Sequence, residues 1–377
     1  MPDSRFLQIH TLHGYSAVLL NRDDSGLAKR ILYGDAIRTR VSSQCLKRHW
    51  RTADSPHALQ QINGAVASVR SRETVSRRVI QPLREAGYDA GVIDTISTCF
   101  QKAVYGKKRG DESRQPLLLG EPEIEYLAAE ALKIAQEHGT DAEAAAKAAE
   151  GWQKDSKANM KVMRENCSIP GGIAAALFGR MVTADVEANI DAAVHVAHAF
   201  TVHREESESD YFTVVDDLQG AADDTGADYI GETELTSGLF YGYVVLDRNG
   251  LVRNLGGDAE MAGEVAERLV RLIATVTPGA KLGPTAPYGY ASWMVVEAGD
   301  RQPRSLAEAY REPCKPDRFV AAETAGQFLK KIDALYETGE TRRFISLEET
   351  GVPGAKRSES LRELASWAGR VVKAGSA

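Results

Sequence analysis

The sequence predicts an α+β protein, in which a β-sheet carries helices on one face. Three observations predict this class. Segments that alternate, or are rich in β-branched and aromatic residues, occur near the start and throughout the second half. A long helical stretch separates the first of them from the others, and an amphipathic helix lies between the last two. The composition, with 43% hydrophobic and 26% charged residues in a chain of 377, is typical of a soluble globular protein.

The chain starts with a predicted strand and a short predicted helix. Phe6–Leu12 is rich in apolar residues and alternates, which predicts a strand. The following "TRVSSQ" leads into a helix with Ser42 or Ser43 as its N-cap, because a hydroxyl there can accept a hydrogen bond from the first turn. In the helix "QCLKRHWR", Trp50 is expected in the core and His49 at the surface.

Residues 61–165 are predicted to be helical. The stretches "INGAVASVRSRETVSRRVIQPLREAG" and "EIEYLAAEALKIAQEHG" have a period near 3.6 residues, and "DAEAAAKAAEGWQKD" is rich in strong helix formers. Tyr105–Pro116 is basic, contains glycine and is expected to be a loop. The apolar segment Ile169–Met181, with its Gly-Gly turn, is expected to return the chain to the sheet.

The second half of the chain supplies the remaining sheet and two helices. An acidic excursion separates the first two of its strands, and the resulting order suits a ferredoxin-like plan. The predicted strands are Asp191–His203, Gly238–Asp247 and Tyr290–Gly299, and the predicted helices are Glu264–Pro278 and Ser358–Gly375.

Positive charge is concentrated near the start of an acidic chain. The formal net charge is −7, yet the first 115 residues hold 19 Lys and Arg against 11 Asp and Glu. The stretch "RTRVSSQCLKRHWR" carries five Arg or Lys residues beside two serines and a glutamine. A helix start with hydroxyls and nearby cations can bind phosphate groups. The segment therefore predicts a face that binds a polyanion, and a solvated amphipathic helix is the alternative.

The sequence lacks the patterns that are typical of several other classes of protein. No apolar run is long enough to span a membrane and the first residues lack a signal-peptide core, so a cytoplasmic protein is expected. The four cysteines form no CxxC pair. His195, His198 and His203 lack the HExxH pattern, and a strand would place the first two on opposite faces. We expect neither a metal nor another cofactor.

Residues 200–234 have the opposite charge, with eleven Asp or Glu and a single Arg. Tyr211, Phe212 and Ile230 are the unusual residues of this segment. On a hairpin they could wedge between stacked bases. Alternatively, they form a local cluster that holds the hairpin together.

Seven blocks, in this order, resemble the CasC family, the Cas-seven-type backbone subunit of the type I-E CRISPR Cascade complex. The match covers roughly the first 50 residues and most of 165–300, and it is general elsewhere. It implies a discontinuous RRM-like (ferredoxin-like) palm of residues 1–60, 166–200 and 235–377, a helical fingers insertion at 61–165 and a thumb β-hairpin at 201–234. The blocks are "LNRDD", "RTRVSSQCLKRHWR", "LFGRM", "HAFTVH", "DYFTVVDDL", "SGLFYGY" and "TPGAK".

The resemblance implies a protein that is not an enzyme. About six copies would line the spacer of a CRISPR RNA, with the other Cascade subunits, and displace one base at regular intervals so that the guide pairs with target DNA in segments. The alternative is a metal-dependent ribonuclease on an RRM-like fold, because related backbone subunits of other CRISPR types cleave RNA with a loop aspartate. Near the basic helix the sequence offers Asp23, Asp24 and Asp35 for such a role.

The resemblance also implies which residues make contacts. Met181 would pack on a guide base, whereas Phe212 and Ile230, with Tyr211 beside them, would lie at the displaced base. The thumb acids, among them Asp223 and Asp224, are expected to face a basic surface of the adjacent copy. Phosphates and sugars would meet Asn21, Arg22, Lys29, Arg40, Ser42, Ser43, Gln44, Lys47, Arg48 and Arg51. The candidates for contacts with target DNA or a neighbouring subunit are Arg70, Arg72, Arg77, Arg78, Lys107, Lys108 and Arg109.

Overall fold

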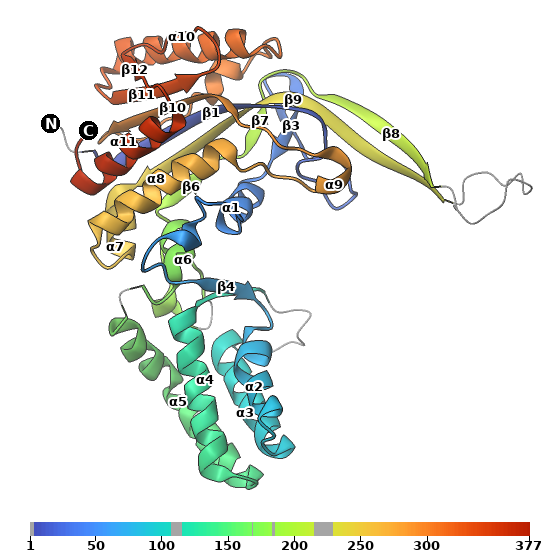
Figure 1. Cartoon of the computed structure of the whole chain (residues 1–377), viewed down its shortest axis with the longest axis vertical. Helices are drawn as coiled ribbons and strands as arrows, with labels where there is room; N and C mark the ends of the chain where they lie inside the picture. The colour runs from blue at the N-terminus through green and yellow to red at the C-terminus, as the bar shows by residue number, and fades with distance from the viewer. Residues whose placement is uncertain (1–3, 107–114, 168, 183–184, 215–228) are drawn as a thin grey trace, which may run out of the picture. The chain divides into compact units, whose positions relative to one another are not determined.

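The chain forms two compact units in the computed structural model (Figure 1). The structure describes residues 4–106, 115–167, 169–182, 185–214 and 229–377, and only the backbone of residues 214, 229 and 230. Unit 1 comprises residues 1–58, 195–246 and 263–377, and unit 2 comprises residues 59–194 and 247–262.

Unit 1 is built on a largely antiparallel sheet with the order β12-β11-β10-β1-β9-β7-β3-β2. β6 and β8 also pair with β9, and β11 and β12 run parallel. Strands were predicted correctly at Phe6, Gly238 and Tyr290, but the predicted strand Asp191–His203 is two short strands interrupted before Ala199. The strands are β1 (Phe6–Val18), β2 (Arg30–Tyr33), β3 (Ala36–Val41), β6 (Val194–Val196), β7 (Ala199–Thr201), β8 (Glu206–Val214), β9 (Tyr229–Asp247), β10 (Ala291–Gly299), β11 (Thr341–Ser346) and β12 (Ala355–Arg357).

The helices of unit 1 cover both faces of this sheet, so the expectation of helices on one face was wrong. Leu12, Trp293 and Val295 share a core with α10, whereas Trp367 of α11 lies on the other face, with its ring 5.4 Å from the Arg343 guanidinium. The reason is that β10 is apolar in both of its alternating rows and needs cover on each side. The helices are α1 (Ser43–Arg51), α8 (Ala259–Thr275), α9 (Leu282–Thr285), α10 (Arg318–Tyr336) and α11 (Leu361–Ala374), with a 3₁₀ turn η5 (Ala307–Tyr310).

A buried carboxylate, Glu297 of β10, holds several strands of unit 1 together. It accepts hydrogen bonds from His10 Nε2 at 2.9 Å, from Arg304 Nη2 at 2.8 Å and from Arg342 Nε. The Tyr241 hydroxyl lies 2.8 Å from His10 Nδ1. Burial alone would raise the pKa of Glu297, but the hydrogen bond from His10 and the charges of the two arginines lower it well below its ordinary value.

Unit 2 is mainly helical, around a core in which the rings of Phe100 and Trp152 stack 3.8 Å apart. Among the described residues of the chain, none of the helices has the length and apolar character needed to cross a membrane. The elements are η1 (Leu59–Gln61), β4 (Ser68–Ser71), the π-helical η2 (Val75–Ile80), α2 (Gln81–Glu85), α3 (Ala90–Tyr105), β5 (Leu117–Gly120), α4 (Glu121–His138), α5 (Ala142–Glu165), α6 (Gly172–Phe178), η4 (Val186–Ala188) and α7 (Arg248–Asn254).

Two predictions for unit 2 were wrong. The stretch predicted as helix from residue 62 contains a strand, β4, which pairs with β5 from Ser68↔Gly120 to Ser71↔Leu117. The partner strand is distant in sequence, so a local period could not reveal it. The segment expected to return to the sheet forms helix α6 instead, because its run "IAAALF" has high helix propensity once Gly172, at φ +74°, has turned the chain.

Gly151 provides a simple test of α5. It lies inside the helix, and a Cβ there would meet no atom within 4 Å. We expect Gly151→Ala to raise the free energy of unfolding by about 0.5–1 kcal/mol, because alanine restricts the unfolded chain. Thermal unfolding checks this. Gly120→Ala is the contrasting variant, since its Cβ would lie 1.9 Å from the Pro170 carbonyl oxygen and should destabilise the protein.

Candidate nucleic-acid interface

The start of α1 is a preformed anion-binding terminus in unit 1. Ser42 is the N-cap, as predicted, and its Oγ accepts a hydrogen bond from the Cys45 amide at 3.3 Å. The Ser42 amide donates to Asn21 Oδ1 at 2.9 Å. Asn21 and Ser42 thus shape the terminus through contacts within the chain. The amides of Ser43 and Gln44, in the first turn, have no intrahelical acceptor and can serve an external anion.

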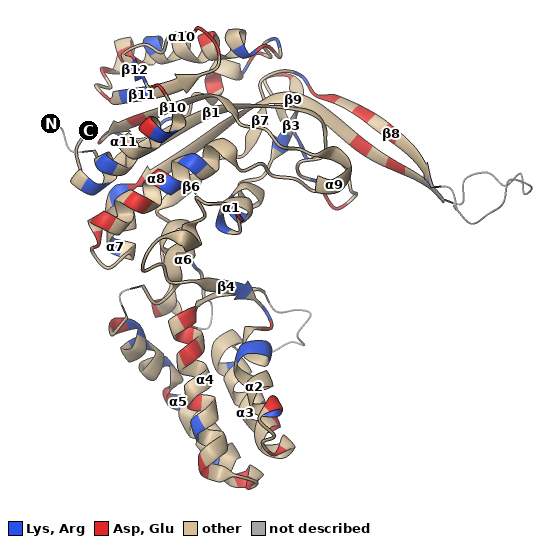
Figure 2. Ribbon diagram, viewed as in Figure 1, with Lys and Arg blue, Asp and Glu red and all other residues tan. Residues whose placement is uncertain are grey.

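Lys and Arg residues lie along α1 and on the loop and strand beside it (Figure 2), and we call Lys29, Arg40, Lys47, Arg48 and Arg51 the basic surface. Arg40 Nη1 lies 2.9 Å from His198 Nδ1. Partial burial and the charges of Arg40 and Lys29 lower the pKa of His198. The charges of Arg48 and Lys29 also act on Cys45, whose pKa burial raises. Residues from the loop, β3 and α1 therefore share one electrostatic environment.

Two nearby arginines, Arg38 of this stretch and Arg30 upstream of it in β2, have structural roles instead. Arg38 is fully buried and donates to the main-chain oxygens of Thr201, Tyr310 and Arg311 at 2.9, 3.0 and 3.1 Å. Arg30 forms ion pairs with Glu205 and Glu234. Arg30 and Arg38 therefore add little to the positive charge available to a ligand at this surface.

His49 is half-buried, so its predicted exposure was wrong, whereas Trp50 is in the core as predicted. The Nδ1 of His49 lies 2.8 Å from the Cys45 carbonyl oxygen, and its Nε2 accepts from the Gly279 amide at 3.4 Å. The ring can reach both partners because "TPGAK" packs against α1. His49 is therefore a link between two segments of unit 1.

The loop before β2 carries Arg22 at its exposed side. Its Asp23 Oδ1 accepts hydrogen bonds from the amides of Ser25 and Leu27 at 2.9 and 3.0 Å, which closes the turn. Asp23 is therefore occupied in the local structure. Across the described part of the chain, no three or more His, Cys, Asp or Glu side chains come close enough to hold a metal ion.

The β8–β9 hairpin projects from the sheet of unit 1 (Figure 1). Its register pairs Phe212 with Gly231, and Thr213 with Ile230. Opposed residues of an antiparallel pair share a face, so positions 212 and 230 belong to different faces of the hairpin. Tyr211 is 62% exposed. Acidic residues recur along β8, as Figure 2 shows, but Asp223 and Asp224 lie outside the described residues.

Lys281, which sequence reasoning did not single out, holds the Phe212 side of the hairpin. Its Nζ donates to Thr233 Oγ1 at 2.6 Å and lies 6.0 Å from the centre of the Phe212 ring. The ring covers Gly231 so closely that a Cβ there would be 2.3 Å from it. Lys281 also borders a cavity of about 500 Å³ that Arg22 and the base of the hairpin line. The only sequence signal for it was its place in the block "TPGAK".

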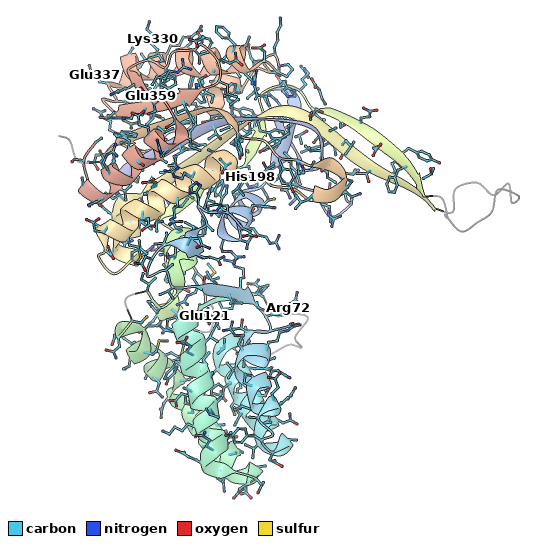
Figure 3. The ribbon with its side chains drawn as sticks, viewed as in Figure 1. Arg72, Glu121, His198, Lys330, Glu337 and Glu359 are labelled. Atoms are coloured by element: carbon cyan, nitrogen blue, oxygen red, sulfur yellow. The ribbon has the colours of Figure 1, made fainter. Side chains whose placement is uncertain are left out.

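The remaining predicted contacts belong to unit 2 and are described within it. Met181 is 79% exposed. Arg70 and Arg72 are exposed, and Figure 3 labels Arg72 and Glu121. Arg78 donates to both carboxylate oxygens of Glu121 at 3.2 and 2.8 Å. Arg77 pairs with Glu73, and Lys107, Lys108 and Arg109 lie outside the described residues.

The family model of the CT1975-like proteins matches residues 7–368. The chain belongs to the CT1975-like protein family. The match spans all seven blocks that resemble CasC proteins, so the recognition of a CRISPR backbone-subunit family is confirmed. No curated protein matches the chain.

CT1975-like architecture also recurs in solved structures. A chain of a "CRISPR RNA-guided surveillance complex, pre-nicking" is 27% identical, with a TM-score of 0.78 over 97% of this chain and 100% of that one. A chain of a second "CRISPR RNA-guided surveillance complex" is 24% identical, with a TM-score of 0.69 over 97% and 99%, and shows the shared fold.

Proposed function

We propose that this chain is a CRISPR RNA-binding backbone subunit of a type I-E Cascade complex and has no catalytic activity of its own. The observation that carries the proposal is the CT1975-like match over residues 7–368. The likeness to a chain of a CRISPR RNA-guided surveillance complex supports it. About six copies would line the guide spacer in the cytoplasm, where the other subunits and target DNA join them.

The terminus of α1 and the basic surface would hold the guide by its backbone. Amides of Ser43 and Gln44 and the side chains of Lys47 and Arg48 are donors suited to phosphate oxygens. Such contacts carry no sequence information. Specificity would therefore come from base pairing between guide and target.

The hairpin would displace a guide base. The Phe212 ring is already seated on Gly231 beside Lys281, so it needs little reorganisation to act as an apolar wedge. The acids along β8 are poor neighbours for an RNA backbone. They suit a basic surface of the next copy instead.

Purification of the chain tests RNA binding directly. We expect a large species that carries cellular RNA, shown by its ratio of absorbance at 260 and 280 nm, and that becomes smaller on ribonuclease treatment. A preparation free of RNA that also fails to bind added CRISPR RNA in the presence of its companion subunits would contradict the proposal.

Cleavage assays test the non-catalytic part of the proposal. Incubation of the assembled complex with labelled complementary RNA and magnesium should leave the RNA intact. Steady cleavage that persists through purification would instead favour the metal-dependent ribonuclease, and Asp23→Asn, Asp24→Asn and Asp35→Asn would then show which carboxylate acts.

Gly231→Ala and Phe212→Ala should both disturb the displacement of the guide base. The added Cβ would lie 2.3 Å from the ring and must push it away from its seat. We expect assembly to persist while the regular spacing of protected guide segments is lost in nuclease probing. Gly351→Ala is the control, since its Cβ would meet nothing within 4 Å. Normal spacing in the Gly231→Ala variant would show that the seated ring is not the wedge.

A further inference from the structure

Met181 lies on a narrow segment of unit 2 that alternates between exposed and buried residues. Arg180 and Val182 are 5% and 6% exposed, on either side of the exposed Met181. The amide and carbonyl of Arg180 pair with Ile190, both at 2.9 Å, and the Val182 amide donates to Asn189 Oδ1 at 2.6 Å. The direction of Met181 therefore depends on how firmly its two neighbours are held.

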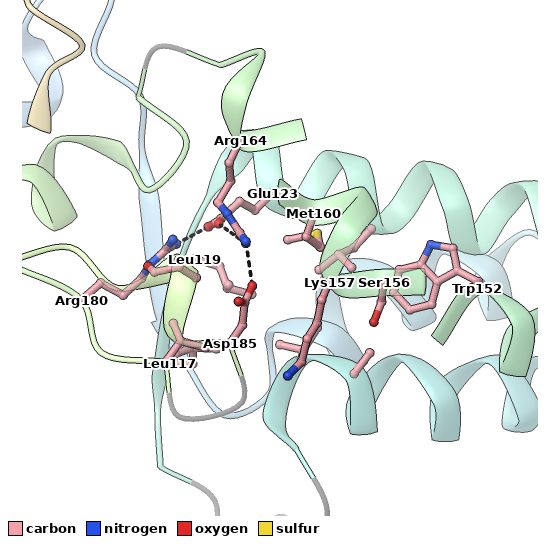
Figure 4. Close-up of a pocket in the computed structure, with 15 residues that line it drawn as sticks. Leu117, Leu119, Glu123, Trp152, Ser156, Lys157, Met160, Arg164, Arg180 and Asp185 are labelled. Carbon is pink, nitrogen blue, oxygen red and sulfur yellow. Dashed lines mark hydrogen bonds and ion pairs between the residues drawn. The ribbon is translucent and has the colours of Figure 1, made fainter. Parts of the chain in front are cut away.

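Arg180 is held from α4. Its Nη1 forms a buried ion pair with Glu123 Oε2, and its Nε donates to the Ala188 carbonyl at 2.9 Å (Figure 4). The same Glu123 oxygen accepts the Gly120 amide at 3.0 Å, at the start of α4. The Glu123 side chain is 1% exposed, so this contact is shielded from water.

A second tie comes from α5. Arg164 Nη2 donates to Asp185 Oδ2 at 2.7 Å, and its Nη1 lies 3.9 Å from Glu123 Oε1 (Figure 4). Glu123, Arg164, Arg180 and Asp185 thus form one network of alternating charge, which we call the four-residue network. It joins both long helices of unit 2 to the segment that carries Met181.

The four-residue network fixes the orientation of the segment that carries Met181 more than it adds to stability. A buried ion pair adds little to stability compared with apolar residues of the same size, but it admits few arrangements. A cavity of about 40 Å³, lined by Met160, Val182 and Ala188 among others, borders the network. Apolar packing alone therefore leaves the segment incompletely held on that side.

We propose that Glu123, Arg164 and Asp185 are positioning residues that hold Arg180 and its segment so that Met181 meets a guide base in one orientation. The proposal rests on the proposed function for its RNA contact. In this proposal the helical insertion helps to orient a guide contact, through Glu123 of α4 and Arg164 of α5.

The experiment compares Glu123→Gln and Asp185→Asn, which keep the size and one acceptor oxygen of the side chain but remove its charge, with Met181→Ala. Glu143→Gln is the matched control, because it removes the same charge from an exposed pair with Lys147 on α5. The first readout is the ¹³C ε-methyl resonance of Met181, assigned by its absence in Met181→Ala. The second is the affinity for a labelled single-stranded CRISPR RNA.

We expect Glu123→Gln and Asp185→Asn to shift and sharpen the Met181 methyl signal and to leave that of the buried Met294 in unit 1 unchanged. Each should weaken RNA binding about 2- to 10-fold, the range of a methionine contact with an aromatic ring. Neither should weaken it further once Met181 is alanine. Glu143→Gln should behave as the wild type.

An unchanged Met181 signal in both variants would overturn the proposal, as would equal losses of affinity in the presence and absence of Met181. A shifted signal in a protein whose wild type binds no RNA would leave the positioning intact and refute the proposed function. Thermal unfolding of each variant separates a general loss of structure, which would broaden signals from several methionines, from the local change expected.

Discussion

Replacing Lys47 and Arg48 together by alanine should weaken binding of the guide roughly 100-fold at low salt. Both residues belong to the basic surface and lie on α1, with Arg48 in its last turn. A hydrogen bond to a charged group contributes about 1.5 kcal/mol, and 1.4 kcal/mol is a factor of ten in affinity. The loss should be similar for every spacer sequence, because contacts to phosphates do not read bases.

The salt dependence of this binding gives an independent measure. The slope of log affinity against log salt should fall by about 1.4 in the double variant, at roughly 0.7 for each lost phosphate contact on a single strand. Lys330→Ala with Lys331→Ala is the matched control. It removes the same charge from α10, on the opposite face of the sheet from α1 (Figure 3). An equal effect of the control would mean that net charge, and not the α1 terminus, drives binding.

Glu297→Gln should lower the free energy of unfolding by about 3 kcal/mol at neutral pH. The change removes one of two carboxylate partners from each of Arg304 and Arg342, which keep Glu340 and Asp333. The loss should therefore lie at the lower end of the roughly 3–5 kcal/mol that breaking a buried pair costs. Urea unfolding of the purified chain measures it. Glu264→Gln, which removes an exposed partner of Arg268, should cost only about 0.3–0.5 kcal/mol.

The pH dependence of this difference has a fixed sign. The pKa of Glu297 is lowered in the folded protein, so its contribution is present above the ordinary value of about 4.5 and is lost as the pH falls below it. The wild type and Glu297→Gln should therefore converge in stability under acid. Burial and the charge of Glu297 raise the pKa of Glu340 to about 7, so the comparison is made below pH 4.5, where Glu340 is already protonated. A difference that grows as the pH falls in that range would show that Glu297 is not held ionised.

Local rules predicted the elements whose determinants are adjacent in sequence. The Ser42 cap and the burial of Trp50 follow from the spacing of a few residues around α1. The strand β4 could not be found in this way, since its partner β5 lies across a helical stretch. The apolar residues in both rows of β10 are visible in the sequence, but only the assembled sheet shows which helix covers each face.

In the candidate site, too, some features follow from adjacent residues and others only from the assembled fold. Lys47 and Arg48 could be proposed from helical spacing, but the pairing of β3 with β7 brings Arg40 to His198. Arg38 and Arg40 look alike in the sequence, and only the fold shows that residues 310 and 311 cover the first. The register that separates positions 212 and 230 is also a property of the closed hairpin.

The four-residue network has a consequence for how this family can be recombined. Glu123 and Arg164 lie inside residues 61–165, whereas Arg180 and Asp185 lie after them. A chimaera that exchanges only 61–165 for a segment without these two residues would split both pairs. It would leave the buried Arg180 and the partly buried Asp185 without these partners. A charge change at one of these positions therefore needs a compensating change at its partner. A functional exchange of the helical insertion must extend past residue 190.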